Sequence, residues 1–166
     1  MSTMENLSEA FAGESQANRK YLAFAKKADS EGFPQVARLF RAAAEAETIH
    51  AHAHLRVMGG VRDTAANVKA AIEGEGFEFQ NMYPKFVEEA KAEGNAPAVT
   101  SFGNALAVEK IHFDLYGSAA KSLQSGKDLP RKNIYVCLVC GNTVLDGAPD
   151  KCPICGNKKE GFVEVK

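Results

Sequence analysis

Hydrophobic residues recur along much of the chain at the spacing of helices that each bury one face. This period predicts a helix over about residues 3–30, a second over 34–58 and a long later helix over 96–126. A Gly-Phe-Pro sequence separates the first two helices, because glycine commonly ends a helix and proline commonly opens one. The chain is therefore expected to be mainly α-helical.

The segment between the second and the last of these helices has a less regular pattern. A glycine pair ends the second helix, and Asp63 is a typical N-cap for a short helix that runs through Ile72. A third long helix is predicted over residues 73–93. The short helix would lengthen the connection between the second and third long helices, and a ferritin-like bundle requires one such crossover.

Two of the predicted helices carry a glutamate and a histidine three residues apart, at Glu47 and His50 and again at Glu109 and His112. On a helix such a pair lies on one face about a turn apart, so both side chains can reach one metal ion. Both pairs occupy positions where apolar residues belong, and buried charges are paired or bind metal. The two pairs therefore predict a metal centre inside the helical part.

The two E-x-x-H pairs belong to an internal repeat with an offset of 62 residues. Other identical positions at this offset are Tyr21 and Tyr83, Phe24 and Phe86, Ala28 and Ala90, and Phe40 and Phe102. The repeat indicates a duplicated helix pair in which each half supplies similar ligands to one site.

Three further glutamates extend the candidate ligand set. Glu14 lies within the apolar stripe of the first helix, and the repeat makes Glu75 its counterpart. Glu78 has no counterpart but lies one turn from Glu75 on the same face. The alternative for each is a partly exposed, solvated helix charge. Beside the two E-x-x-H pairs, we favour metal ligation for all three.

The repeat also predicts a local distortion of the third helix. Its offset is 61 residues around Glu75 but 62 from Tyr83 onward, so one extra residue lies between them. Pro84 also removes a backbone hydrogen bond from the helix. We expect a π-bulge or kink between Glu75 and Pro84, a device common at functional sites.

The C-terminal segment contains two cysteine pairs, each followed by glycine. These are Cys137-x-x-Cys140-Gly141 and Cys152-x-x-Cys155-Gly156. Such a pattern is a strong signal for one tetrahedral four-thiolate metal site. Zinc and iron both fit four thiolates, and the spacing alone favours zinc. Two disulfides are the weaker alternative, because a chain expected in the cytoplasm should keep its thiols reduced.

Composition narrows the possible roles. The formal net charge of -1 argues against nucleic acid or an anionic membrane as the main partner. The polar N-terminal segment does not resemble a signal peptide, and no apolar run approaches the roughly 20 residues that cross a bilayer. We expect a cytoplasmic protein with a helical domain over residues 1–130 and a four-cysteine domain over 131–166.

Taken together, these motifs resemble those of the rubrerythrin family. The residues that carry the resemblance are Ala12-Gly13-Glu14-Ser15-Gln16, Glu47-x-x-His50, Glu75-Gly76-Phe77-Glu78, Met82-Tyr83-Pro84, Glu109-Lys110-Ile111-His112 and the two cysteine pairs. The resemblance covers the chain from about Glu5 to its end. It implies a ferritin-like four-helix bundle followed by a small, β-rich rubredoxin-like domain, with iron rather than zinc in the four-cysteine site.

The resemblance also implies a role for each candidate ligand of a di-iron site. Glu47 and Glu109 would bridge the two irons, with Glu14 terminal on one iron and Glu75 and His112 on the other. His50 and Glu78 would alternate on the first iron, the histidine when it is ferrous and the glutamate when it is ferric. The phenols of Tyr21 and Tyr83 would hydrogen-bond to ligating carboxylates.

The function implied is the reduction of hydrogen peroxide to water, in defence against oxidative stress. Electrons would come from an NAD(P)H-dependent reductase or a rubredoxin through the four-thiolate iron, since the chain has no nucleotide-binding loop of its own. A homodimer is expected, and whether helices are exchanged between its chains is left open. The alternatives are a ferroxidase or iron-storage protein and a zinc-ribbon binding module on a structural bundle.

Overall fold

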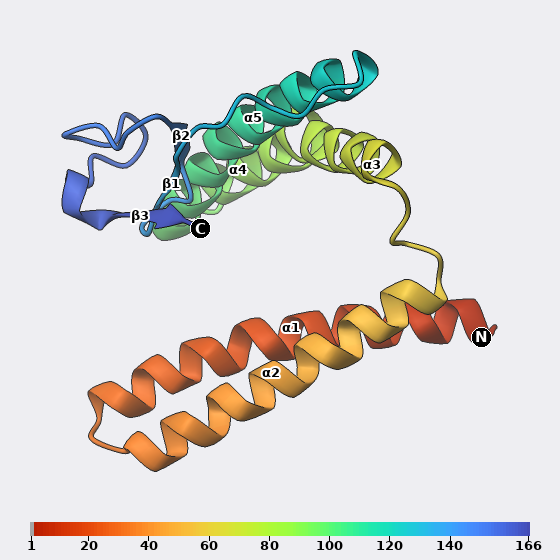
Figure 1. Ribbon diagram of the computed structural model, residues 1–166. Coiled ribbons are helices and arrows are strands. Elements are labelled where there is room, and N and C mark those ends of the chain that lie inside the picture. The colour runs from red at the N-terminus through yellow and green to blue at the C-terminus, as the bar shows by residue number, and fades with distance from the viewer. Residues whose placement is uncertain (1) are drawn as a thin grey trace. The chain divides into compact units, whose positions relative to one another are not determined.

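The computed structural model describes residues 2–166 and divides after Arg62 into two compact units. The first unit is a pair of helices, and the second consists of further helices followed by a small three-stranded sheet (Figure 1). The fold class expected from the sequence is confirmed, with the helices of a four-helix bundle followed by a β-rich module that contains four cysteines.

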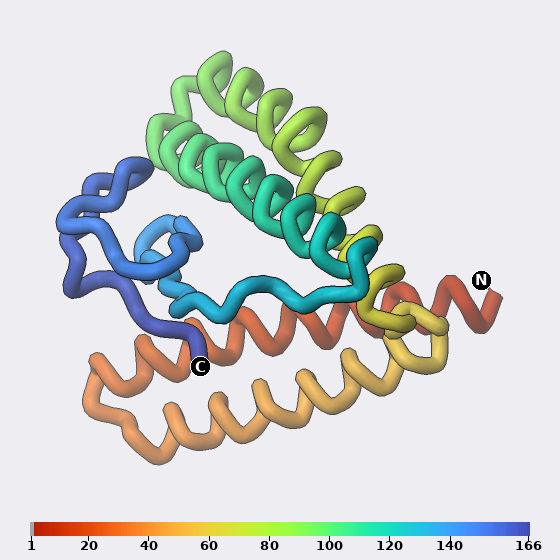
Figure 2. Tube along the Cα trace, turned by 45° about the horizontal axis from the view of Figure 1, so that its top comes forward, coloured from red at the N-terminus to blue at the C-terminus, as the bar shows by residue number. Residues whose placement is uncertain are grey.

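The first unit is an antiparallel helical hairpin. Helix α1 (Thr3–Ser30) and helix α2 (Pro34–Val57) run side by side in both views (Figures 1 and 2). Both sets of bounds agree with the sequence prediction. Small side chains allow the two helices to pack closely, and the buried core of the hairpin is Ala25, Ala28 and Ala37 with Phe40 packed against it.

The helices of the second unit correct two predictions. Helix α3 (Thr64–Phe77), the π-helical segment η1 (Glu78–Met82) and helix α4 (Tyr83–Ala92) form one helical stretch that packs along helix α5 (Ala96–Gln124). The predicted short helix ending at Ile72 is therefore wrong, because α3 continues through this point. Only residues 58–63 connect α2 to α3, so the long crossover expected from the sequence is also wrong.

Two glycines, Gly74 and Gly76, lie in α3 beyond the predicted boundary. An isolated glycine inside a helix costs only about 1 kcal/mol, which tertiary packing readily offsets. Gly76 is buried, and a Cβ atom built on it would lie 3.1 Å from a ring carbon of Phe113 on α5. This glycine therefore permits close packing of α3 on α5 instead of marking a helix boundary.

The predicted π-bulge is confirmed by segment η1. The backbone N–H of Tyr83 donates to the carbonyl oxygen of Glu78, five residues earlier, as in a π-helix. Pro84 follows at once and has no N–H to donate. The extra residue found in the repeat is thus accommodated here, in the segment that carries Glu78.

The C-terminal module is a small antiparallel sheet with strand order β2-β1-β3. Its strands are β1 (Ile134–Cys137), β2 (Thr143–Leu145) and β3 (Phe162–Val165), with the 3₁₀ turn η2 (Lys159–Gly161) before β3. Cys137, Cys152 and Phe162 form its buried core. With so few apolar side chains, the module resembles small domains that depend on a bound metal for stability.

Much of the apolar face of α2 is exposed. Leu39 and Val57, both in the stripe expected to be buried, are each 70% exposed. The hairpin therefore presents a face that has the composition of a core. Within residues 2–166, no helix combines the length and apolar character that crossing a membrane would require.

Candidate metal centres

The first candidate centre lies on the α1–α2 hairpin. Glu14 comes from α1, and Glu47 and His50 come from adjacent turns of α2. His50 Nδ1 lies 2.9 Å from Glu47 Oε2 and 3.9 Å from Glu14 Oε1. One potential ligand atom from each residue lies within 4.8 Å of the other two. The hairpin thus brings Glu14 of α1 next to the E-x-x-H pair of α2, so that three residues of the kinds that bind metals form one group.

The second centre repeats this geometry in the other unit. Glu75 comes from α3, and Glu109 and His112 come from α5. His112 Nδ1 lies 2.9 Å from Glu109 Oε2 and 3.5 Å from Glu75 Oε2. The histidine–glutamate distance within the E-x-x-H motif is therefore the same in both halves of the repeat. In both groups the nitrogen that faces the carboxylates is Nδ1.

The environment of Glu75 gives the clearest indication that a cation can bind in the second centre. Its Oε2 atom is buried and has no hydrogen-bond partner among the described residues. Burial raises the pKa of Glu75 to about 7, with the contact to Glu109 and the charge of Glu78 adding to the rise and His112 opposing it. A buried carboxylate surrounded by other carboxylates is costly unless a proton or a metal ion compensates it. The donor set therefore fits a bound cation.

Glu78 lies near the second centre but is not part of it. The structure does not place it within the 4.8 Å distances that join Glu75, Glu109 and His112. Burial nevertheless raises the pKa of Glu78, the charge of Glu109 adds to the rise, and His112 lowers it. Glu78 thus lies within the electrostatic field of the centre, on a π-helical segment.

The two tyrosines are placed among aromatic side chains. The ring of Tyr21 lies 6.1 Å from that of Phe40, and the ring of Tyr83 lies 6.3 Å from that of Phe102. Burial and the charge of Glu78, followed by those of Glu109 and Glu75, raise the pKa of the Tyr83 phenol. Tyr83 therefore stays protonated and can donate a hydrogen bond. The predicted bonds from both phenols to ligating carboxylates stay predictions.

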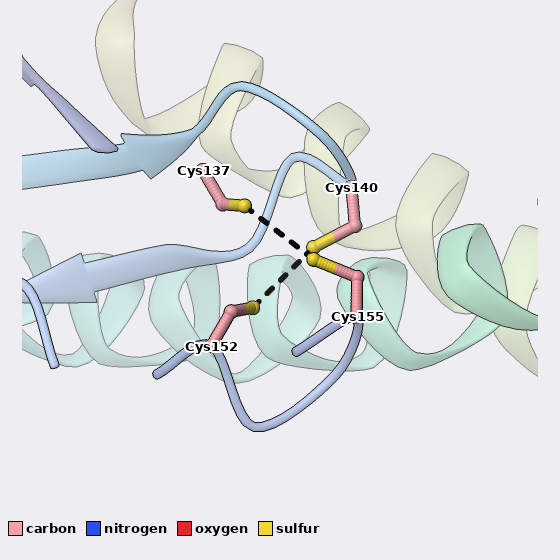
Figure 3. Close-up of side chains that lie close together, drawn as sticks. All are labelled: Cys137, Cys140, Cys152 and Cys155. Atoms are coloured by element: carbon pink, nitrogen blue, oxygen red, sulfur yellow. Dashed lines mark hydrogen bonds between the residues drawn. The ribbon is translucent and has the colours of Figure 1, made fainter. Parts of the chain in front are cut away.

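The four cysteines converge on one point between two turns of the C-terminal module (Figure 3). All four are free thiols, so the disulfide alternative is wrong for this structure. The Sγ–Sγ distances are 3.7 Å for Cys137 and Cys155 and 3.6 Å for Cys140 and Cys152. Metal–sulfur bonds of about 2.3 Å in a tetrahedron place sulfur atoms about 3.8 Å apart. The sulfurs are therefore spaced for one metal ion.

Backbone and side-chain N–H groups surround these sulfurs. Burial opposes ionisation of Cys137, but N–H groups of Cys140, Val139 and Asn157 outweigh it and lower the pKa of Cys137 to about 6. Burial and the neighbouring sulfurs raise the pKa of Cys140 to about 12. A metal ion that binds all four sulfurs as thiolates therefore has to displace protons from the thiols.

Two asparagines connect the cysteine turns, and the sequence analysis missed both. Asn142 Nδ2 donates to Cys152 Sγ at 3.6 Å, and Asn157 Nδ2 donates to Cys137 Sγ at 3.7 Å. Each asparagine follows the glycine of one turn and contacts the first cysteine of the other. The signal was present in the sequence, because both turns read C-x-x-C-G-N.

This chain combines paired helices that carry two Glu-Glu-His groups with a four-thiolate module. These features are those of helical di-metal carboxylate proteins with a rubredoxin-like tail. The sequence profile described as "Rubrerythrin" matches residues 5–120. The profile described as "Rubrerythrin, rubredoxin-like domain" matches residues 135–163. The chain belongs to the rubrerythrin family, whose members are generally peroxide-reducing di-iron proteins.

Individual relatives match along almost their whole length. Rubrerythrin-2 of Clostridium acetobutylicum is 36% identical over 174 residues, covering 96% of this chain and 95% of the relative. Nigerythrin of Nitratidesulfovibrio vulgaris is 36% identical over 175 residues, covering 97% and 85%. A solved structure of nigerythrin in its fully reduced, all-ferrous state has a TM-score of 0.58 at 33% identity, covering 99% of this chain and 87% of that chain.

The raised pKa of Glu75 predicts how the stability of the metal-free chain depends on pH. The folded chain keeps this proton at pH values where the unfolded chain has released it. The stability that the proton contributes is therefore complete below the unfolded pKa of about 4.3 and is lost as the pH rises through about 7. The stability of E75Q relative to the unsubstituted chain should thus increase between about pH 5 and pH 8.

Urea unfolding of both chains at several pH values measures this difference. E73Q removes an exposed carboxylate from the same helix and is the matched control. A relative stability of E75Q that does not vary with pH, or varies no more than that of E73Q, would contradict the assignment.

The asparagine contacts predict the redox behaviour of the iron-loaded C-terminal module. An N–H donor stabilises the reduced iron–thiolate centre more than the oxidised one, because the reduced centre carries more negative charge. N157A should therefore lower the reduction potential by on the order of tens of millivolts. A redox titration followed by visible absorption tests this, with N133A, an exposed position in the same module, as the control. A potential equal to that of N133A would show that Asn157 has no such effect.

Proposed function

We propose that this chain is a hydrogen peroxide reductase with a di-iron site and a four-thiolate iron. The observation that carries the proposal is the presence, in one chain, of two Glu-Glu-His groups and a four-thiolate group. Membership of the rubrerythrin family and the similarity to all-ferrous nigerythrin support iron at these positions. The four-thiolate group would hold the third iron, with zinc as a possible substitute in a given preparation.

The proposed di-iron site draws on both halves of the repeat. Glu47 and Glu109 would bridge the irons, with Glu14 and Glu75 as terminal ligands. Four carboxylates and two neutral imidazoles compensate the charge of two ferrous ions, as in other di-iron carboxylate proteins. A fifth carboxylate, Glu78, would suit the oxidised state, because a harder and charged oxygen ligand is favoured by a more highly charged ion.

Peroxide reduction consumes two electrons and two protons and yields two waters. When bound, a pair of ferrous ions supplies both electrons at once, so that no radical needs to be released. The chain itself would contribute the protonated Tyr83 phenol as a hydrogen-bond donor near Glu78. Replacing His50 by Glu78 on oxidation would offset one of the two positive charges that the pair of irons gains.

The four-thiolate module favours peroxide reduction over iron storage as the function. A four-thiolate iron changes by one electron at a time, which suits relay between a donor and the di-iron site. A ferroxidase has no need of such a module. We propose an NAD(P)H-dependent reductase or a rubredoxin as the donor, and hydrogen peroxide as the substrate.

The short connection between α2 and α3 supports a dimer in which helix pairs are exchanged. A ferritin-like bundle needs one connection that runs the length of the bundle. Residues 58–63 can span at most about 25 Å between the helix ends, whereas the 24 residues of α2 measure about 36 Å. We therefore propose that the first hairpin of one chain completes its site with the second helix pair of a partner copy. The exposed apolar face of α2 would be covered in this way.

The catalytic proposal predicts the oxidant preference of the reduced protein. In stopped-flow measurements, the anaerobically reduced, iron-loaded chain should be reoxidised by hydrogen peroxide faster than by dioxygen by orders of magnitude. E78A should still bind ferrous iron but lose peroxide turnover by at least about tenfold. E88A, which removes an exposed carboxylate from α4, should behave like the unsubstituted chain. Equal or faster reaction with dioxygen would favour the ferroxidase alternative.

The exchange of helix pairs predicts complementation between two inactive chains. E47A disables the first hairpin, and E109A disables the second helix pair. In a mixed dimer with exchange, one site carries both substitutions and the other carries neither, so about half of the activity should return. Without exchange each site keeps one substitution, and co-expressed, co-purified mixed dimers should stay inactive.

A further inference from the structure

His50 and His112 are equivalent in the repeat, but they differ in the contacts of Nε2, the ring nitrogen that lies opposite the carboxylates. His112 Nε2 lies 3.0 Å from the hydroxyl oxygen of Thr143, the first residue of β2. The His112 side chain is 27% exposed, whereas the His50 side chain is 55% exposed. The ion pairs and hydrogen bonds of His50 within the described residues are to Glu14 and Glu47.

The hydrogen bonds of Thr143 indicate a direction for this contact. Its hydroxyl group donates to the carbonyl oxygen of Gly141 at 3.2 Å. A hydroxyl group has one proton, so an oxygen that donates to Gly141 accepts the Nε2–H proton of His112. Nδ1 lies 2.9 Å from Glu109 Oε2, within hydrogen-bond distance, and it also faces Glu75. A metal ion bound at Nδ1 would replace this contact, and a neutral imidazole that binds a metal through Nδ1 carries its one ring proton on Nε2.

Packing holds Thr143 in place for this role. Gly141, in the cysteine turn, lies against α5, and a Cβ atom built on it would be 3.7 Å from Cγ1 of the buried Val108. Thr143 is also paired in the sheet, opposite Val136 of β1. The cysteine turn and the sheet edge therefore bring the hydroxyl group to the helix turn that carries Glu109 and His112.

We propose that Thr143 is a positioning residue that fixes the tautomer and ring orientation of His112 for metal binding. The proposal rests on the proposed role of His112 as a ligand. Outer hydrogen bonds of this kind orient ligating histidines and contribute substantially to metal affinity. The four-cysteine module thus supports one histidine of the helical site within the same chain. Within residues 2–166 the ring of His50 has no comparable contact, and the family resemblance implies that His50 is the ligand that Glu78 replaces.

The test uses full-length protein loaded with Zn²⁺, which gives sharp NMR signals and no redox chemistry. T143V removes the hydroxyl group at nearly constant shape, T143S restores it, and T100V alters an exposed threonine on α5 as the matched control. The Nε2–H proton of His112 should be visible and protected from solvent exchange in the unsubstituted chain, T143S and T100V. In T143V its exchange should be at least about tenfold faster, and Zn²⁺ should bind the helical groups about 10–100-fold more weakly.

The outcomes separate this inference from the proposed function. If the unsubstituted chain binds Zn²⁺ but carries the His112 proton on Nδ1, or if T143V matches T143S in both readouts, the inference is wrong while the peroxidase proposal stands. Failure of Zn²⁺ and Fe²⁺ to bind the helical groups at all would overturn both. If T143V does not fold, as judged by circular dichroism, T143A provides the same comparison. Protection of the Nε2–H proton in the unsubstituted chain tests the direction of the bond without any variant.

Discussion

Several carboxylates lie on helix faces that should be apolar. The electrostatic cost of this placement is the constraint on which the helical part depends. Glu75 is its clearest case, because a buried oxygen without a hydrogen-bond partner is tolerated only with a proton or a cation nearby. The pKa of Glu75 is raised to about 7, so a proton can serve this purpose in the metal-free chain. In the proposed di-iron site, a pair of metal ions would compensate all of the carboxylates at once and would so couple metal binding to the assembly of the helices.

Close helix packing makes this compensation possible. Alanines between α1 and α2, and Gly76 beneath the ring of Phe113, let the backbones approach and bring ligands from different helices together. Each pair of helices supplies only three residues of ligand type at close range, fewer than two metal ions require. The connection after α2 comprises only residues 58–63, and this short length is the observation behind the proposed exchange of helix pairs with a partner copy.

Local sequence rules predicted much of this structure. The bounds of α1 and α2, the E-x-x-H pairs, the π-helical segment and the four-thiolate group all follow from spacing, because each depends on residues close together in the chain. The predicted boundary at Ile72 was wrong because α3 packs along α5, where Gly76 lies against Phe113, and this packing partner lies far away in the sequence. Thr143 and the asparagines were missed for a similar reason, since their partners are set by how the turns and α5 come together.

The departures from the repeat are as informative as the repeat itself. Two identical halves would give two histidines with equal reason to stay on the metal or to leave it. Both departures lie in the second half, where the inserted residue of η1 accompanies the surplus Glu78 and the C-terminal module brings Thr143 to His112. In the proposed di-iron site, the first would add a competing ligand and the second would hold one histidine in place. These two departures would make His112 the fixed histidine and His50 the replaceable one, which is the asymmetry that the proposed redox-dependent change of ligand requires.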